Sequence, residues 1–341
     1  MTPMLPLLVL ATLLLAPGAQ AQDPADNDPV ALAQASAYQA YAGRLPQALA
    51  QAGGARELAL AALLRQLQAQ AGTATTGSAP RPTPADAQVQ AWQRDAAARA
   101  GQDPVALQLL AASAVGSDEA LRLEAARRWQ AADPGNLYPL LAAGLDAEAL
   151  LAAAADATRA DSRMYEGVRW VMSAYRQHPP GEREQAALAA GGDGDLDEAA
   201  AMAAVGLWAA ARPGLAPLFE ACDARTLRAV PARRDACLGI ARLLADGSDN
   251  VADEAAGLSM LQALATGAEE RAELAARQRA LDWRMLQWGR VARQQPREGA
   301  AQFVRLLGDA DITTEQQLVA RVLAEAGVPA EPPAGWTPPR R

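Results

Sequence analysis

The stretch MYEGVRWVMSAY, residues 164–175, places large apolar side chains at helical spacing. Positions i, i+4, i+7, i+8 and i+11 share one face of an α-helix, and here they hold Met164, Val168, Val171, Met172 and Tyr175. The same kind of spacing recurs at 121–129, 237–244, 281–288 and 318–326. The chain is therefore predicted to contain many amphipathic helices.

Composition agrees with this pattern. Of the 341 residues, 88 are Ala and 45 are Leu, against 15 Val, 2 Ile and 12 Thr. Ala and Leu are strong helix formers, whereas β-branched residues favour strands. Asp28-Pro29, Thr83-Pro84 and Asp103-Pro104 each place a capping side chain before a first-turn proline, and Ser117-Asp118-Glu119 opens a further helix. We expect an all-α fold of stacked antiparallel helical hairpins without a β-sheet.

The charges exclude several classes of function. All 31 basic residues are Arg, so chemistry that needs a Lys ammonium group is excluded: phosphate-binding loops ending in Gly-Lys-Ser/Thr, Schiff-base enzymes and kinases. The 39 acidic residues leave a net charge of −8. Because this charge repels a phosphate backbone, nucleic acid is not expected as a partner.

The N-terminus has the pattern of an export signal. The apolar run LPLLVLATLLL, residues 5–15, is followed by Pro17-Gly18 and by Ala19-Gln20-Ala21. This predicts a signal peptide over residues 1–21, cleaved before Gln22. Eleven residues rise only about 16 Å as a helix, about half the thickness of the hydrocarbon core. We therefore expect a periplasmic protein without a transmembrane segment once the signal is removed.

The two cysteines are predicted to form a structural disulfide. Cys222 and Cys237 are separated by fourteen residues, and Pro231 is well placed to begin the second helix of a helix–turn–helix. Such a turn brings the two positions together, and an oxidising compartment would keep them bonded. The alternative is a redox-active pair, which normally has only two intervening residues.

Breaks in the pattern divide the chain into segments. After the signal we expect a helical segment at 22–71, a Thr/Pro/Gly-rich linker at 72–87 and a helical-repeat body at 88–326. Residues 327–341, with their many prolines, cannot continue a helix. We expect them to be a disordered tail or to drape over the last helices.

One stretch resembles a known repeat family. In RRWQAADPGNLYPLLAAG, residues 127–144, a helix ends, Asp-Pro-Gly-Asn turns, and a new helix begins at an aromatic residue. This resembles the junction between consecutive tetratricopeptide repeats, over about 40 residues. The resemblance implies a right-handed superhelix with a peptide-binding groove. Ala-rich helical stacks are also similar to the superhelical domains of periplasmic lytic transglycosylases.

The sequence gives little support for a metal site or a Ser-His-Asp catalytic triad. Asp193, Asp195 and Asp197 occupy positions 1, 3 and 5 of a calcium loop, but Glu198 and Ala204 stand where Gly and Glu are required. These acids are better explained as caps of the following helix, and the loop at 246–250 is interpreted as a connection between helices. His178, the single histidine, builds neither a His-rich zinc site nor a supported Ser-His-Asp triad. We expect no metal and no cofactor.

The sequence leaves the roles of two kinds of residue undecided. Glu166 and Glu220 have apolar neighbours, yet nothing marks a catalytic carboxylate pair. Arg277, Arg284, Arg290 and Arg293 belong to an Arg-rich stretch that is suited to an anionic ligand or a partner. The alternative for these arginines is a surface of ordinary salt bridges.

The sequence as a whole favours an exported, non-catalytic helical-repeat protein that binds or scaffolds a protein or peptide partner in the bacterial cell envelope. The competing hypothesis is a cell-wall-active enzyme that cleaves glycan with a carboxylate as general acid.

Overall fold

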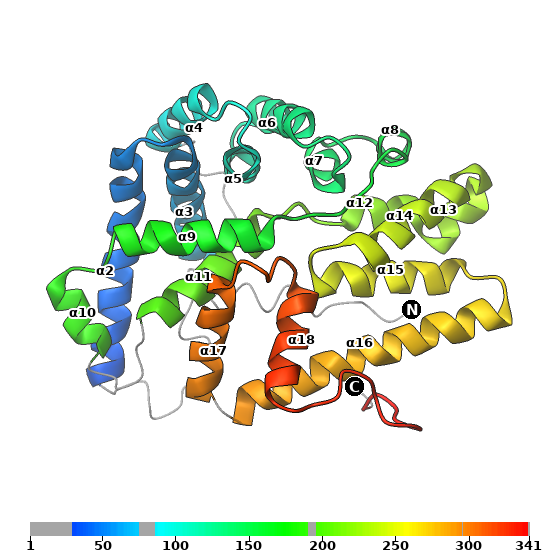
Figure 1. Cartoon of the computed structure of the whole chain (residues 1–341). Coiled ribbons are helices and arrows are strands. Elements are labelled where there is room, and N and C mark those ends of the chain that lie inside the picture. The colour runs from blue at the N-terminus through cyan, green and yellow to red at the C-terminus, as the bar shows by residue number, and fades with distance from the viewer. Residues whose placement is uncertain (1–28, 75–85, 190–195, 295, 340–341) are drawn as a thin grey trace. The chain divides into compact units, whose positions relative to one another are not determined.

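A computed structural model of the chain describes residues 29–74, 86–189, 196–294 and 296–339. The described residues are 77% helical, and they form 17 α-helices and one short 3-10 helix without a strand (Figure 1). The predicted all-α class is thereby confirmed. The predicted signal peptide, residues 1–21, lies outside the described residues.

None of the described helices is by itself both long and apolar enough to cross a membrane. One bent pair, residues 197–211 and 216–222, meets the length and composition criteria together.

The chain divides into two compact units. Unit 1 comprises Met1–Trp129 and Gly167–Arg212, and unit 2 comprises Gln130–Glu166 and Pro213–Arg341. The polypeptide therefore leaves unit 1, enters unit 2, returns to unit 1 and ends in unit 2.

Unit 1 is built around two neighbouring helices, α3 and α5. Its helices are α2 (Pro29–Ala52), α3 (Ala55–Ala74), α4 (Ala87–Arg99), α5 (Pro104–Ala114), most of α6 (Glu119–Ala132), most of α9 (Met164–Gln177), α10 (Glu182–Ala189) and α11 (Leu196–Ala211). Helix α3 packs against α2, α4 and α5, and nearly all residues of α5 are buried. Of the predicted linker at 72–87, residues 75–85 lie outside the described residues, and the helices on either side of it pack together in unit 1.

Capping side chains begin these helices as their sequences predict. The Asp103 carboxylate accepts hydrogen bonds from the backbone N–H groups of Val105 and Ala106, at 3.0 and 3.3 Å, and Pro104 follows in the first turn. Asp118 accepts from the Leu121 N–H at 3.0 Å at the start of α6. Helix α4 begins after Asp86, and the expected Thr83-Pro84 start lies outside the described residues. These carboxylates satisfy N–H groups that a helix leaves without partners.

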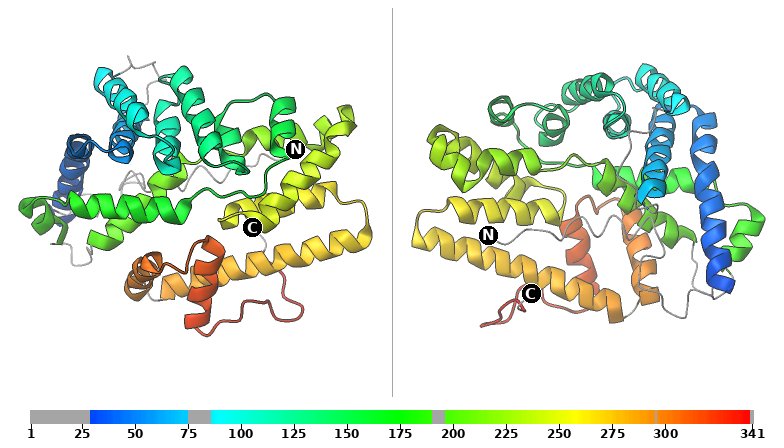
Figure 2. Two further views of the ribbon diagram at one scale, coloured as in Figure 1. Left: turned by 45° about the horizontal axis from the view of Figure 1, so that its top comes forward. Right: turned by 180° about the vertical axis from the view of Figure 1, so that it is seen from behind.

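Unit 2 holds the longest helix of the described chain. Its helices are α7 (Leu137–Ala142), α8 (Ala147–Ala154), α12 (Ala216–Cys222), α13 (Ala224–Ala229), the 3-10 helix η2 (Pro231–Arg233), α14 (Arg234–Gly247), α15 (Val251–Leu264), α16 (Ala268–Gln294), α17 (Pro296–Gly308) and α18 (Glu315–Glu325). Helices α14 and α15 form a tight hairpin, α15 packs on α16, and α16 in turn packs on α17 and α18 (Figure 2).

The junction at 133–136 is present as expected, with α6 ending before it and α7 beginning after it. Helix α7 has only six residues, however.

The α14–α15 hairpin depends on a glycine. A Cβ atom added to Gly257 in α15 would lie 2.4 Å from the Ala245 nitrogen and 2.6 Å from the Ala241 oxygen of α14. Real Cβ contacts are essentially never so short, and backbone atoms of a helix have little freedom to move aside. The two helix backbones therefore lie in direct contact at Gly257.

The predicted disulfide joins the end of α12 to α14. The Cys222 and Cys237 Cα atoms lie 5.6 Å apart in a bonded pair, within the usual range for disulfides. Pro231 begins the short helix η2 that leads into α14, and α13 occupies part of the segment between the cysteines. The predicted helix–turn–helix is thus elaborated by two additional short helices.

Replacing Gly257 by Ala is expected to destabilise the protein by about 2 kcal/mol, because overpacking at a backbone contact outweighs the better helix propensity of Ala. Gly239→Ala in α14 is the matched control, since Gly239 is exposed and has nothing within 4 Å of an added Cβ. That variant should gain about 0.5–1 kcal/mol. Urea unfolding monitored by circular dichroism gives both values. If both substitutions changed the free energy of unfolding in the same direction, the backbone contact at Gly257 would be contradicted.

Removing the disulfide as Cys222→Ser/Cys237→Ser is expected to lower the free energy of unfolding by about 3 kcal/mol, because the open loop regains entropy in the unfolded chain. The wild type in reductant should lose the same amount. Denaturant titrations with and without dithiothreitol measure both. Two free thiols in the unfolded, unreduced protein would refute the bond.

Candidate functional site on helix α16

Helix α16 carries all four arginines that the sequence singled out. It spans 27 residues, with Glu269 and Glu270 in its first turn and Arg293 in its last. Acidic groups at the N-terminus of a helix and basic groups at its C-terminus both interact favourably with the helix dipole. A helix of this length presents different faces to the core and to solvent, so the four arginines need not share a role.

Arg277 and Arg284 lie on the face of α16 that packs against the α14–α15 hairpin. They are seven residues apart, which is two helical turns. Arg277 Nη2 lies 2.5 Å from Asp246 Oδ1, and Arg284 Nη2 lies 3.1 Å from Glu254 Oε1. The Glu254 side chain is only 12% exposed. Both arginines therefore serve to fix α16 on its neighbours.

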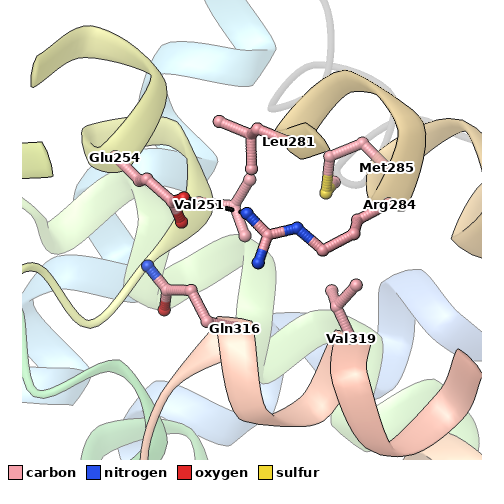
Figure 3. Close-up of a pocket in the computed structure, with 7 residues that line it drawn as sticks. All are labelled: Val251, Glu254, Leu281, Arg284, Met285, Gln316 and Val319. Carbon is pink, nitrogen blue, oxygen red and sulfur yellow. Dashed lines mark hydrogen bonds and ion pairs between the residues drawn. The ribbon is translucent and has the colours of Figure 1, made fainter. Parts of the chain in front are cut away.

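A small pocket opens beside Arg284 (Figure 3). Its cavity volume is only about 10 Å³, and it is lined by Val251 and Glu254 of α15, Leu281, Arg284 and Met285 of α16, and Gln316 and Val319 of α18. Among the described atoms, Arg284 Nε and Gln316 Oε1 are buried without a hydrogen-bond partner. Ligand pockets usually enclose about 300–1,000 Å³. This pocket is therefore too small for a substrate.

Arg290 and Arg293 lie on a different face and are exposed. Arg279 shares this exposure, and none of these three guanidinium groups forms an ion pair with the residues that the structure describes. Arg279, Trp283 and Arg290 stand at i, i+4 and i+11, so they follow one another along the helix surface. The structure thus separates the four candidate arginines into two that are paired and two that are open to solvent.

The C-terminal segment lies along this open surface. Trp283 Nε1 donates a hydrogen bond to the Pro329 carbonyl at 2.9 Å. The Trp283 and Trp336 rings meet edge to face, with centroids 5.3 Å apart and planes at 76°, a geometry that the ring quadrupoles favour. Figures 1 and 2 show the segment returning from α18 to α16. In the structure, the segment 327–339 thus contacts α16 at Trp283.

A glycine turns the chain back toward α16. Gly327 follows α18 with φ +66°, a conformation that costs glycine little. The Val328 N–H donates to the Leu323 carbonyl at 2.9 Å, which closes the end of α18. The direction in which the tail leaves α18 is therefore fixed by the helix cap.

The buried acids Asp133, Asp249 and Asp253 of unit 2 are held in a clamp and do not form an open site. Residues 158–163, here called the clamp segment, lie between the loop before α7 and the loop before α15. The segment pairs with both loops through isolated β-bridges, Asn136 with Arg159 and Ala160 with Ser248. Backbone hydrogen bonds of 2.8 Å from Thr158 N to the Gly135 oxygen and of 3.1 Å from Ala160 N to the Gly247 oxygen hold it there.

Asp133, which is 1% exposed, anchors one side of the clamp. It pairs with Arg159 and, at 2.9 Å, with Arg163, and it also accepts a hydrogen bond of 2.9 Å from Asn136 Nδ2. Arg163 has φ 54°, the left-handed region that few non-glycine residues adopt. Its own N–H donates to Asp161 Oδ1 at 2.8 Å.

Asp249 and Asp253 anchor the other side. Asp249 accepts from Ser162 N at 2.9 Å, from Ser162 Oγ at 2.8 Å and from Met164 N at 3.1 Å. Asp253 accepts from Tyr138 Oη and from Asn250 Nδ2. These buried carboxylates already hold several donors from the protein, as buried charges require. Within the described ranges, no group of three or more His, Cys, Asp or Glu side chains is arranged to hold a metal ion.

The remaining candidates occupy ordinary positions. Glu166 is exposed and pairs with Arg163 at 2.8 Å, and Glu220 is exposed on α12. Of the expected calcium-like loop, Asp193 and Asp195 lie outside the described residues, while Asp197 pairs with Arg176 at 2.8 Å. His178 is half-buried at the end of α9. The structure brings none of these groups together as a carboxylate pair or a triad within the described residues.

The sequence did not reveal the clamp or the role of Trp283 in the tail contact. The local signals were Asn136 and Asn250, each of which caps the helix that follows it by accepting from a backbone N–H. A cap is visible in the sequence, but the partner across the fold is not.

No protein-family model matches this sequence, and searches of curated proteins and of solved structures found no match either.

Asp161 has a titration behaviour that can be measured. Its burial, together with the nearby charge of Asp249, raises the pKa of Asp161 above its ordinary 3.8. A raised pKa means that the folded state disfavours the charged form, so this contribution to stability is present below pH 3.8 and is lost as the pH rises through the folded-state pKa.

Asp161→Asn is therefore expected to raise the free energy of unfolding at pH 7, because the amide oxygen still accepts from the Arg163 N–H without a charge. The gain should shrink as the pH falls toward 4. Denaturant unfolding at several pH values measures it, with the exposed Asp156→Asn as control. That control should change stability by less than about 0.5 kcal/mol. A gain independent of pH would show that charge is not the cause.

Proposed function

We propose that the protein is an exported binding or scaffold module of the bacterial cell envelope, and that it recognises a protein or peptide partner through the exposed face of α16. Arg279, Trp283, Arg290 and Arg293 are here called the α16 open face. The observation that carries the proposal is the division of the arginines on this helix: Arg277 and Arg284 are used in ion pairs of the fold, while Arg279, Arg290 and Arg293 are exposed on the face that also holds Trp283.

This chemistry suits a binding surface. Arg and Trp dominate the energetics of protein interfaces, because each offers a large contact area together with specific donors. Arg also grips carboxylates in a bidentate manner. A partner with acidic side chains is therefore the best match for the α16 open face.

The export part of the proposal is supported by the signal-like residues 1–21 and by the Cys222–Cys237 disulfide. Disulfides persist in oxidising compartments and are rare in the cytosol. We also propose that the protein has a helical-repeat architecture similar to that of tetratricopeptide proteins. The turn at 133–136 and the packed helical hairpins of both units support this.

Photo-crosslinking in envelope extract tests the proposal, since amine-directed reagents find no Lys in this chain. Arg290→Ala/Arg293→Ala is expected to reduce capture of the partner at least about tenfold, because two hot-spot arginines each contribute about 1–2 kcal/mol. Arg225→Ala/Arg228→Ala is the matched control, as it removes the same charge from exposed positions on α13.

Equal capture by the two double variants would contradict a role for the α16 open face. Release of soluble fragments from peptidoglycan by the purified protein would favour the glycan-cleaving alternative instead.

A further inference from the structure

We propose that the Trp283 surface of α16 is a docking site for an extended, proline-rich segment that carries an aromatic side chain and acidic residues, and that the chain's own tail occupies this site in the free protein. The inference rests on the proposed function, because it names the class of partner that the α16 open face would recognise.

The geometry of the tail supports this assignment. The segment GVPAEPPAGWTPP, residues 327–339, leaves α18 and makes two anchoring contacts with Trp283. One is the hydrogen bond from the indole N–H to the Pro329 carbonyl, and the other is the edge-to-face contact with the Trp336 ring. The Trp283 side chain thus contacts both a backbone carbonyl and an aromatic ring of the tail, which lie seven residues apart.

The chemistry of proline-rich chains fits the Trp283 surface. Proline has no N–H, so the carbonyls of such segments lack backbone partners and remain available as acceptors. The extended conformation is largely preformed, which lowers the entropy lost on binding. Proline-rich ligands accordingly dock on aromatic surfaces that also supply a side-chain donor. Trp283 offers both a flat ring and a donor.

The tail is held only weakly on the Trp283 surface. Val328, Pro332 and Trp336 are half-buried, and every other residue of 327–339 is exposed. An edge-to-face ring pair contributes about 0.5–1.5 kcal/mol, and the tether supplies an effective concentration of about millimolar. A partner segment with a few additional contacts would therefore displace the tail.

Those additional contacts have a defined chemistry. Arg279 lies about one turn before Trp283, and Arg290 about two turns after it, both exposed. Acidic residues on either side of the proline-rich core would meet them, and the tail itself contains Glu331. This charge complementarity favours an acidic proline-rich segment of another protein as the displacing partner.

The test uses a fluorescent peptide with the sequence of residues 327–339 and the full mature chain. The Trp336→Ala variant should bind the peptide about tenfold more tightly than the wild type, because its own tail competes less well for the surface. A tenfold change in affinity corresponds to the free energy of a strong contact between two aromatic rings. Trp283→Ala in the Trp336→Ala background should abolish this binding, and fluorescence anisotropy measures each affinity.

Two controls keep the test independent of folding. Trp283→Phe in the same background retains a ring but loses the N–H donor, so it should bind several-fold more weakly. A peptide with its prolines replaced by serine should also bind more weakly to an unchanged protein. Circular dichroism verifies that each variant is helical.

Failure of the peptide to bind the Trp336→Ala chain at 1 mM, or equal binding of the serine peptide, would overturn the inference. A concentration-dependent dimer of the wild type that Trp336→Ala dissolves would also overturn it, in favour of tails exchanged between two copies. If the peptide fails while Arg290 and Arg293 still govern crosslinking, the proposed function survives and only this inference falls.

Discussion

The contact between the α14 and α15 backbones at Gly257 determines where α16 can lie. Alanine forms helices readily, but its single methyl group buries little apolar area, at about 25 cal/mol per Å². Helices rich in Ala therefore gain enough contact only by approaching closely, and the missing Cβ of Gly257 permits the closest approach. Helix α15 is then fixed, and α16 packs on it through apolar residues such as Leu281 and through the pairing of Arg284 with Glu254.

Close packing of small residues gives little specificity, because one alanine-lined face resembles another. The clamp segment supplies some of the packing specificity that the alanines do not provide. Asp133 and Asp249 reach their full set of donors only when residues 158–163 lie between the two helix-capping loops, so a wrong register would leave buried charges unpaired. Such a mismatch costs several kcal/mol even where the correct pair adds little net stability. The clamp therefore selects one arrangement of unit 2 more than it strengthens that arrangement.

The features that the sequence predicted are local ones. Helical periodicity, the Asp103 cap and the Cys222–Cys237 spacing involve residues that are close in the chain, and each appears in the structure. The clamp segment joins Ser162 to Asp249, which are 87 residues apart, and no local pattern encodes such a pairing. The roles of the arginines of α16 are partly predictable from the sequence. Their spacing shows which of them share a face, but only the packing of α15 shows that the face of Arg277 and Arg284 is used by the fold.

An open basic surface on a chain with net charge −8 raises the question of how an acidic partner could approach. At physiological ionic strength the screening length is about 8 Å, so distant acids contribute little to the potential at α16. The guanidinium groups of Arg279 and Arg290 stand within about two or three helical turns of each other, and they therefore act on a ligand almost independently of the net charge. The overall charge slows the encounter with an acidic partner without preventing the docked state. Affinity for such a partner should then be decided at Trp283 and its flanking arginines, while the acidic remainder of the surface disfavours other anionic ligands.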